Sequence, residues 1–188
     1  MHTNNPSTDF FPFNIAILRA KNQTRHHFPF IRAAVRAIAP VNQQLLMVYS
    51  SEVGDYKFPG GGVKAGETHQ QALNRELQEE TGRNLALQCD LLGTALELDL
   101  STEIRVSSFR MISFYYLCTL EARIQPLSLE PYEQSLGFTP VWISPAEALR
   151  CNEKLAADSR KSTPFWLERE IEVLRLLIPI IDNLDCSN

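Results

Sequence analysis

Three glutamates, Glu76, Glu79 and Glu80, stand at positions i, i+3 and i+4 of one segment. On a helix these positions share one face, and their carboxylates repel each other unless a cation compensates. Glu80 is also angularly close to Leu73 and Leu77, so its side chain is expected to be partly buried. Clustered carboxylate oxygens suit a hard divalent cation such as Mg²⁺ or Mn²⁺. The spacing therefore indicates a metal site, and a solvated acidic helix face is the alternative.

Three consecutive glycines, Gly60–Gly62, precede the glutamates. A chain of glycines can turn tightly and present its backbone without side-chain obstruction, so it can offer a carbonyl to a metal or amides to a phosphate. The sequence lacks the G-x-x-x-x-G-K-[ST] pattern of a P-loop. Taken alone, three glycines are more often a simple turn, so the hypothesis of a functional loop depends on the neighbouring glutamates.

The segment that carries the glutamates has clear helix-end signals. Thr68 and Gln71 fit a capping box, and Gly82 suits the left-handed position that follows a helix. These signals predict a helix over about His69–Thr81. Arg75 adjoins the cluster in sequence but is expected to point elsewhere, so we expect it to orient a neighbouring carboxylate rather than to neutralise the site.

The remaining pattern predicts an α+β fold. A loop is expected over Gln125–Leu136, and Leu45–Tyr49 is expected to be the return arm of a hairpin with Phe30–Ile38. Two further helices are predicted, one from the Ser144 cap to about Arg150 and one from Thr163-Pro164 to about Leu177. The predicted strands are Phe13–Arg19, Phe30–Ile38, Leu45–Tyr49, Tyr56–Pro59, Leu85–Leu100, Arg105–Glu121 and Phe138–Ile143.

The composition bounds the class of protein. The chain has 188 residues, 44% of them hydrophobic, and a formal net charge of −4. These values favour one globular domain and argue against wholesale disorder and against an extended nucleic-acid surface. We expect a flexible tail over residues 1–12 and a single domain over 13–188. The segment up to about residue 29 would be an N-terminal extension that pairs with a partner or covers a sheet edge.

Targeting signals and membrane segments are not expected. The N-terminus lacks the basic and apolar regions of a signal peptide, and no apolar stretch is long enough to span a bilayer. The cysteines are scattered without a CxxC pair, which favours free thiols in a reducing compartment and hence a cytoplasmic protein. These cysteines are Cys89, Cys118, Cys151 and Cys186.

The segment Phe58–Gly82 resembles the Nudix box, G-x5-E-x7-R-E-U-x-E-E-x-G-U, in which U is aliphatic. Arg83 occupies the last aliphatic position, a departure that concerns packing under the helix end rather than the metal site. The Phe-Pro-Gly-Gly lead-in and the segment Gly137–Ala148 extend the resemblance to about Phe30–Leu177. The matching charged and glycine positions are Gly61, Glu67, Arg75, Glu76, Glu79, Glu80 and Gly82.

The resemblance implies a Nudix-type α/β/α sandwich with a mixed sheet and a catalytic loop–helix motif. It implies metal-dependent hydrolysis of the diphosphate linkage of a nucleoside diphosphate derivative, a small-molecule substrate. Glu76, Glu79 and Glu80 would bind one to three Mg²⁺ or Mn²⁺ ions, with the Gly60 carbonyl as a further ligand. Glu67 would support the loop–helix geometry or bond to Arg75, while the ions neutralise phosphate charge and activate a water.

The general base is open, because members of the family use either a box glutamate or a glutamate on a later loop. Glu133 is the first candidate on such a loop, and Glu130 is the second; the alternative for each is a solvated loop acid. These two residues therefore carry the prediction that a second segment of the chain completes the site.

Candidate substrate contacts are Arg32, Arg36, Tyr49, Phe58 and Gly61. Arg32 and Arg36 alternate along a predicted strand and could meet phosphates, or they could be solvated strand charges. Tyr49 and Phe58 could stack on a base, although core packing is the favoured alternative for Phe58.

Two other functions fit the same resemblance. A non-catalytic Nudix-fold module that binds a nucleotide is one, but such modules commonly lose box glutamates that this chain keeps. An isomerase of the isopentenyl-diphosphate type is the other, and the sequence offers no Cys/His metal cluster to support it. ADP-ribose, dinucleoside polyphosphates, nucleoside triphosphates including oxidised ones, nucleotide sugars and capped RNA all remain as substrates, and a homodimer is one assembly that the resemblance allows.

Overall fold

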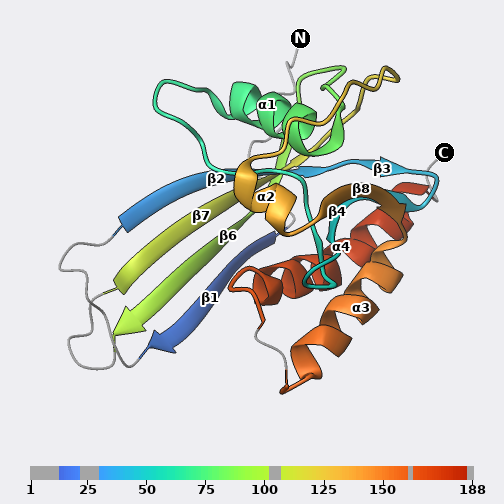
Figure 1. The fold of residues 1–188 in the computed structure, drawn as a ribbon. Coiled ribbons are helices and arrows are strands. Elements are labelled where there is room, and N and C mark those ends of the chain that lie inside the picture. The colour runs from blue at the N-terminus through green and yellow to red at the C-terminus, as the bar shows by residue number, and fades with distance from the viewer. Residues whose placement is uncertain (1–12, 22–29, 102–106, 161–162, 186–188) are drawn as a thin grey trace, which may run out of the picture.

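The computed structural model describes residues 13–21, 30–101, 107–160 and 163–185. Within them the chain forms two sheets and four helices (Figure 1). The larger sheet has the order β1 (Phe13–Lys21), β6 (Asp90–Ser101), β7 (Ser107–Leu117) and β2 (Phe30–Ile38). The smaller sheet contains β3 (Pro40–Val41), β4 (Gln44–Ser50), β5 (Tyr56–Lys57) and β8 (Phe138–Ile143). The helices are α1 (His69–Thr81), α2 (Pro131–Ser135), α3 (Pro145–Ala157) and α4 (Leu167–Asp185).

The larger sheet is mixed. Strands β6 and β7 are antiparallel, whereas β1 is parallel to β6 and β2 is parallel to β7. Strand β1 therefore covers the β6 edge of its own sheet, which is one of the two roles expected for the N-terminal extension. The expected flexible tail over residues 1–12 lies outside the described residues.

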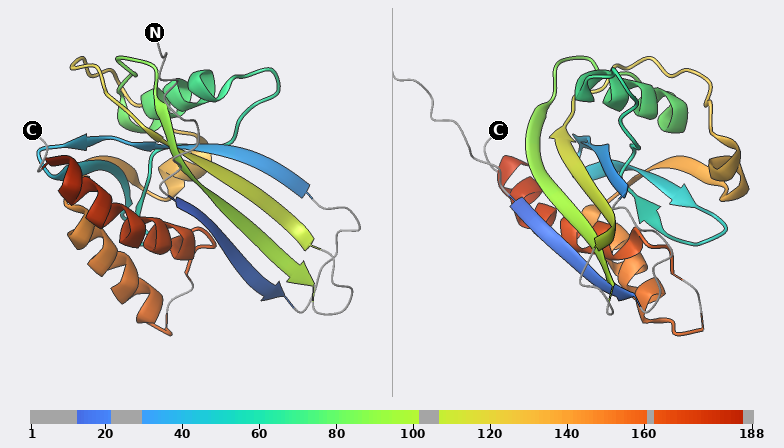
Figure 2. Two further views of the ribbon diagram at one scale, coloured as in Figure 1. Left: turned by 180° about the vertical axis from the view of Figure 1, so that it is seen from behind. Right: turned by 90° about the vertical axis from the view of Figure 1, so that its left-hand side faces the viewer.

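Helices cover both faces of this arrangement (Figures 1 and 2). Helix α1 packs on one face, in a core cluster that joins Leu73 and Leu77 to Val35 of β2. On the other face α4 contributes Leu174 and Leu177 to a second cluster, together with the aromatic and aliphatic side chains Phe13, Met47, Phe58 and Tyr115. The predicted α/β/α sandwich with a mixed sheet is therefore confirmed.

Some boundaries and pairings differ from the prediction. Strand β2 pairs with β7, so the predicted hairpin between Phe30–Ile38 and Leu45–Tyr49 is wrong. The chain instead continues from β2 into the short strand β3, and the turn residues Asn42 and Gln43, both with positive φ, connect β3 to β4. The sequence shows where this chain turns, but a strand's partner depends on residues far away in the sequence.

The later helices were predicted too short or missed. Helix α2 lies inside the predicted loop Gln125–Leu136. It was missed because it has only five residues and begins with Pro131, a residue that is also common in loops. Helix α3 continues beyond Arg150 to Ala157, and α4 begins at Leu167 and continues to Asp185. Among the described residues, no helix is both long and apolar enough to cross a bilayer.

Candidate active site

Helix α1 has the ends that the sequence predicts. The Thr68 hydroxyl accepts from the Gln71 amide, the Gln71 side chain accepts from the Thr68 amide, and Gly82 adopts φ 69° beyond the last turn. Leu73 and Leu77 are fully buried, which fixes the rotation of the helix. The same rotation buries Glu76 and Glu80, each of which stands three residues after one of these leucines.

Three buried carboxylates converge beside this helix. One oxygen each of Glu76, Glu80 and Glu133 can be chosen so that all three lie within 4.8 Å of one another. Glu76 and Glu80 come from α1, whereas Glu133 comes from α2, about 50 residues later in the chain. Buried carboxylates this close repel one another, and a hard divalent cation is the partner that such a set of oxygens fits.

Glu80 is the most deeply buried member of the cluster, with 0% of its surface exposed. Its Oε1 lies 2.7 Å from the Lys57 Nζ, and its Oε2 accepts from the Gly60 amide at 2.7 Å. Burial raises the pKa of Glu80 to about 7, although Lys57 and the Gly60 amide act in the opposite direction. Glu80 thus ties the glycine loop to the helix.

Arg75 contacts several carboxylates of the box. Its guanidinium lies 2.7 Å from Glu67, 2.7 Å from Glu76 and 3.0 Å from Glu79, and it also donates to the Gly62 carbonyl at 3.0 Å. The expectation that Arg75 points away from the cluster is therefore wrong, because its long side chain folds back along α1. Its expected role in orienting neighbouring carboxylates agrees with these contacts.

The electrostatic consequences differ between two of these partners. Hydrogen bonds from Arg75 lower the pKa of Glu67 to about 2, so this carboxylate is ionised at neutral pH. Burial raises the pKa of Glu76, while Arg75 opposes the shift. Glu67 also accepts from the Lys64 amide at 2.9 Å, so it links the loop to Arg75. Arg75 therefore favours the ionised form of both carboxylates, and only at Glu76 does burial outweigh it.

The glycine loop requires glycine at two points. Gly60 has φ 139°, and a Cβ there would lie 2.0 Å from the Val35 carbonyl oxygen. A Cβ on Gly61 would lie 2.5–2.7 Å from the Glu76 carboxylate group. The loop can approach strand β2 and helix α1 this closely only because it lacks side chains at both positions.

Replacing Gly61 by alanine is expected to lower activity without unfolding the protein. The new methyl group would displace the Glu76 carboxylate from the cluster, and a displacement of this size is expected to lower kcat about 10- to 100-fold. Steady-state kinetics measures the effect. Gly54→Ala is the control for an added methyl, because a Cβ there would meet nothing within 4 Å; its φ of 87° also strains an alanine, a cost that Gly61 does not carry. Equal losses in both variants would contradict the prediction.

The two arginines of β2 lie along the glycine loop. Arg36 is buried and donates to the Gly60 carbonyl, whereas Arg32 is exposed and its guanidinium lies over Gly62. Both therefore remain candidates to contact a phosphate at this loop. The Gly60 carbonyl remains a predicted metal ligand, and in this structure it accepts from Arg36.

The aromatic candidates have different surroundings. Phe58 is completely buried, and its ring packs edge-on against Tyr115 with centroids 5.6 Å apart. It has no exposed surface to stack on a base, so its predicted substrate contact is corrected to a role in packing. Tyr49 is half-buried, and its ring lies 5.0 Å from that of Tyr56, so it remains a candidate.

The Glu133 carboxylate is held by its own helix. Its Oε2 accepts from the Glu130 amide at 2.8 Å, and its Oε1 accepts from the Tyr132 hydroxyl at 3.0 Å. Glu133 is 3% exposed, whereas Glu130 is exposed. Of the two predicted candidates for the general base, the structure brings only Glu133 to the cluster.

Lys57 was missed by the sequence analysis. It is buried beside Glu80 of the carboxylate cluster, and its Nζ also lies 4.2 Å from the centroid of the Phe138 ring. The available signal was a single basic residue within the predicted strand Tyr56–Pro59, just before the glycine loop. A buried lysine requires a carboxylate partner, and Glu80 is that partner.

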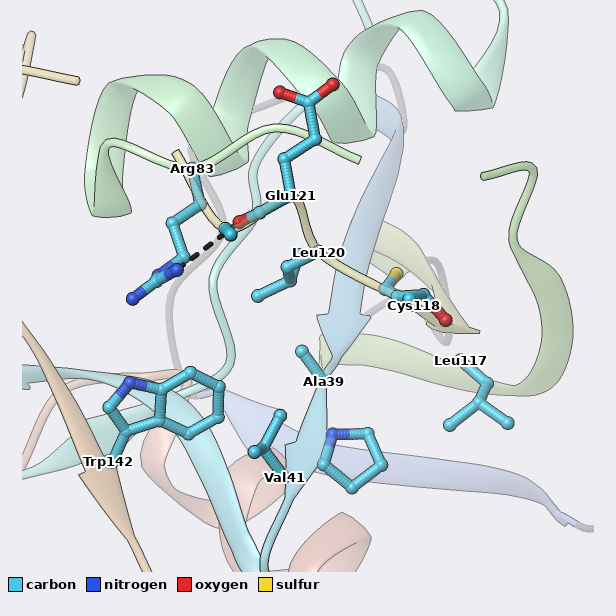
Figure 3. Close-up of a pocket in the computed structure, with 11 residues that line it drawn as sticks. Ala39, Val41, Arg83, Leu117, Cys118, Leu120, Glu121 and Trp142 are labelled. Carbon is cyan, nitrogen blue, oxygen red and sulfur yellow. Dashed lines mark hydrogen bonds between the residues drawn. The ribbon is translucent and has the colours of Figure 1, made fainter. Parts of the chain in front are cut away.

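Arg83, the departure from the box pattern, packs against an aromatic ring. Its guanidinium lies 5.8 Å from the Trp142 centroid and donates to the Glu121 carbonyl at 3.3 Å (Figure 3). Both side chains line a cavity of about 520 Å³, together with β3 and with the end of β7 and the segment that follows it. A cation–π contact thus takes the place of aliphatic packing below α1.

The pKa of Glu80 predicts how the stability of the metal-free protein depends on pH. Because the folded protein holds the Glu80 proton more tightly than the unfolded chain, this group's contribution is complete below pH 4.5. It is lost as the pH rises to about 7, a loss of about 3 kcal/mol in the free energy of unfolding. Urea unfolding in a chelator across this range, for wild type and Glu80→Gln, measures it. The difference between the two curves should vary with pH in this direction; a constant difference would contradict the prediction.

A glycine loop that leads into a helix with buried glutamates, set into an α/β/α sandwich, defines the class of fold and site to which this chain belongs. The chain belongs to the NUDIX domain family, whose model matches residues 30–166. The match includes the loop, α1 and α2, and it leaves out β1.

Individual relatives match short parts of the chain. An 8-oxo-dGTP diphosphatase of Proteus vulgaris is 54% identical over 41 residues, 22% of this chain and 36% of that protein. A Bacillus subtilis (strain 168) protein whose name refers to the same activity is 46% identical over 46 residues, 24% of this chain and 31% of that protein. The chain therefore matches about a third of the length of each.

Solved structures share the fold. The mutator MutT protein of Bacillus halodurans superposes with a TM-score of 0.51 at 22% identity, over 64% of this chain and 72% of that one. At this identity the likeness supports the fold alone.

Proposed function

We propose that the protein is a metal-dependent hydrolase that cleaves the diphosphate linkage of a nucleoside diphosphate derivative. The observation that carries the proposal is the convergence of buried Glu76, Glu80 and Glu133 beside the glycine loop. Carboxylate oxygens in such a group fit Mg²⁺ or Mn²⁺, and membership of the NUDIX domain family supports the same chemistry.

Glu76, Glu79 and Glu80 are proposed to hold the metal, with the Gly60 carbonyl as a further ligand. When bound, the metal would neutralise phosphate charge and lower the pKa of an attacking water. The donor set fits such an ion, because it consists of carboxylate oxygens and because Arg75 is shared among three glutamates.

The chain's own residues would prepare the site for this chemistry. Arg75 holds Glu76 and Glu79 in position, and Lys57 does the same for Glu80. Glu133 is proposed as the base that accepts the proton of the attacking water. Its two oxygens each accept one hydrogen bond, so lone pairs remain for a water.

The substrate class that the relatives favour is a nucleoside triphosphate, with 8-oxo-dGTP as the first compound to test. Arg32 and Arg36 are proposed to contact its phosphates, the Gly61 amide to donate to one of them, and Tyr49 to stack on its base. The protein is further proposed to be a single cytoplasmic domain from residue 13 onward that acts on small molecules. A homodimer is its proposed assembly.

A substrate panel with metal controls tests the proposal. Purified protein with Mg²⁺ or Mn²⁺ is offered 8-oxo-dGTP, dGTP, ADP-ribose, a dinucleoside polyphosphate and a nucleotide sugar. We expect turnover of at least one compound, its loss in a chelator, and release of a nucleoside monophosphate. Absence of turnover on the whole panel, together with measurable nucleotide binding, would instead favour a binding module.

A further inference from the structure

Two cysteines face each other where the β6–β7 hairpin opens. The antiparallel register pairs Asp90 at the start of β6 with Leu117 at the end of β7. Cys89 and Cys118 are the next residues outward on the two strands. Opposite residues in an antiparallel pair have Cα atoms about 4.5–5.5 Å apart, a separation that a disulfide bond can span.

Both cysteines are buried in the same core cluster below α1, with 7% and 5% of their surfaces exposed. The two thiols lie close enough to influence each other's ionisation. In the reduced protein each thiol donates to a backbone carbonyl, Cys89 to Leu87 at 3.9 Å and Cys118 to Tyr116 at 3.2 Å. Two thiols at opposite positions of the strand register can be joined with little movement of the backbone.

We propose that Cys89 and Cys118 form a reversible disulfide when a hydroperoxide oxidises the folded protein. The proposal does not depend on the hydrolase activity. It rests on the strand register and on the burial of both cysteines in one core cluster.

The reaction proceeds in two balanced steps. The Cys89 thiolate attacks the terminal oxygen of the hydroperoxide, the O–O bond breaks, and an alcohol or water leaves with a proton. The Cys118 sulfur then attacks the Cys89 sulfenic acid and expels hydroxide, which takes the Cys118 proton and becomes water. Each sulfur loses one electron, and the peroxide gains two.

Cys89 is the better nucleophile of the pair. The interaction with Cys118 lowers the pKa of the Cys89 thiol, whereas the interaction with Cys89 raises the pKa of Cys118. Cys118 lines the cavity that contains Arg83 and Trp142 (Figure 3), which brings solvent-accessible space next to the pair.

The bond would join Cys118, at the end of β7, to the segment 87–89, which is hydrogen-bonded to Gln70 of α1. The Cys89 amide donates to the Gln70 Oε1 at 3.3 Å, and the Gln70 Nε2 donates to the Leu87 carbonyl at 3.3 Å. A disulfide between residues 89 and 118 closes a loop of about 30 residues. Because this cross-link restricts the unfolded chain, it is expected to raise the Tm by roughly 5–10 °C.

Peptide mapping after oxidation tests the proposal on the wild-type chain. The folded protein is treated with hydrogen peroxide, free thiols are blocked with an alkylating agent, and the digest is analysed by mass spectrometry with and without reduction. We expect a peptide pair linked through Cys89 and Cys118 that separates on reduction. Recovery of both cysteines in the alkylated form, or oxidised only to sulfinic acid, would overturn the proposal.

Thermal unfolding gives a second readout. The Tm should rise on oxidation and return on reduction in wild type and in Cys151→Ser, because Cys151 lies on α3 away from the pair. It should not rise in Cys118→Ala or Cys89→Ala, whose Tm values are each compared before and after oxidation, so that any loss of packing cancels. A rise that persists in either alanine variant would contradict the assignment.

Discussion

Glu76→Gln is expected to lower kcat by about 10²- to 10³-fold, because losing this proposed metal ligand would remove several kcal/mol of transition-state stabilisation. Glutamine keeps the shape of the side chain and can still accept from Arg75, but it lacks the charge that would hold the cation. The measurement is steady-state turnover of the best substrate in the panel, with metal titrated to saturation. A kcat within a few-fold of wild type would remove Glu76 from the site.

Stability separates this result from misfolding. Burial raises the pKa of Glu76, so its ionised form is unfavourable in the metal-free protein. Glu76→Gln should therefore unfold in a chelator at the same Tm as wild type or a higher one, and added Mg²⁺ should raise its Tm less. Glu147→Gln is the matched control, because this exposed acid on α3 lies away from the cluster and its loss should leave both kcat and the metal response unchanged.

The sequence predicted α1 and the box residues well because their signals are local. The Thr68 capping box and the left-handed Gly82 lie within a few residues of the helix ends that they determine. The spacing of Glu76 and Glu80 likewise determines their common face once the helix is assumed. The two α1 members of the carboxylate cluster could thus be expected from one short segment.

The contacts that complete the site depend on distant parts of the chain. Glu133 could be named as a candidate, but its position beside Glu80 depends on the short helix α2, which the sequence pattern did not predict. Lys57 reaches Glu80 only because β5 pairs with β4, and Arg36 reaches the glycine loop because β2 lies against it. Pairings of this kind depend on the whole sheet rather than on a local pattern.

A second buried set of charges connects helix α4 to the segment just before the glycine loop. Arg169 of α4, with 1% of its surface exposed, lies 2.6 Å from both Glu97 of β6 and its neighbour Glu170. Glu170 also accepts from the Phe58 amide at 3.2 Å, two residues before Gly60. Helix α4 is thereby connected to the loop that approaches the carboxylate cluster.

Arg169→Met is expected to destabilise the protein by about 3–5 kcal/mol, because it removes the cation from between two buried carboxylates. The Tm should fall by roughly 10 °C. Urea unfolding measures the change in the free energy of unfolding. Arg175→Met is the matched control on the same helix, since Arg175 is half exposed and its pairs with Glu153 and Glu172 should contribute about 1 kcal/mol or less.

Neutralising the carboxylates tests the physical reason for this loss. If uncompensated charge is its cause, adding Glu97→Gln and Glu170→Gln to Arg169→Met should restore part of the lost stability, because amides are less costly to bury than carboxylates. If lost packing is the cause, the triple variant should be no more stable than Arg169→Met.

Turnover tests whether Glu170 positions the glycine loop. Glu170→Gln alone keeps an oxygen that can accept from the Phe58 amide, so its kcat should stay near wild type. Glu170→Ala loses this acceptor and should have a lower kcat.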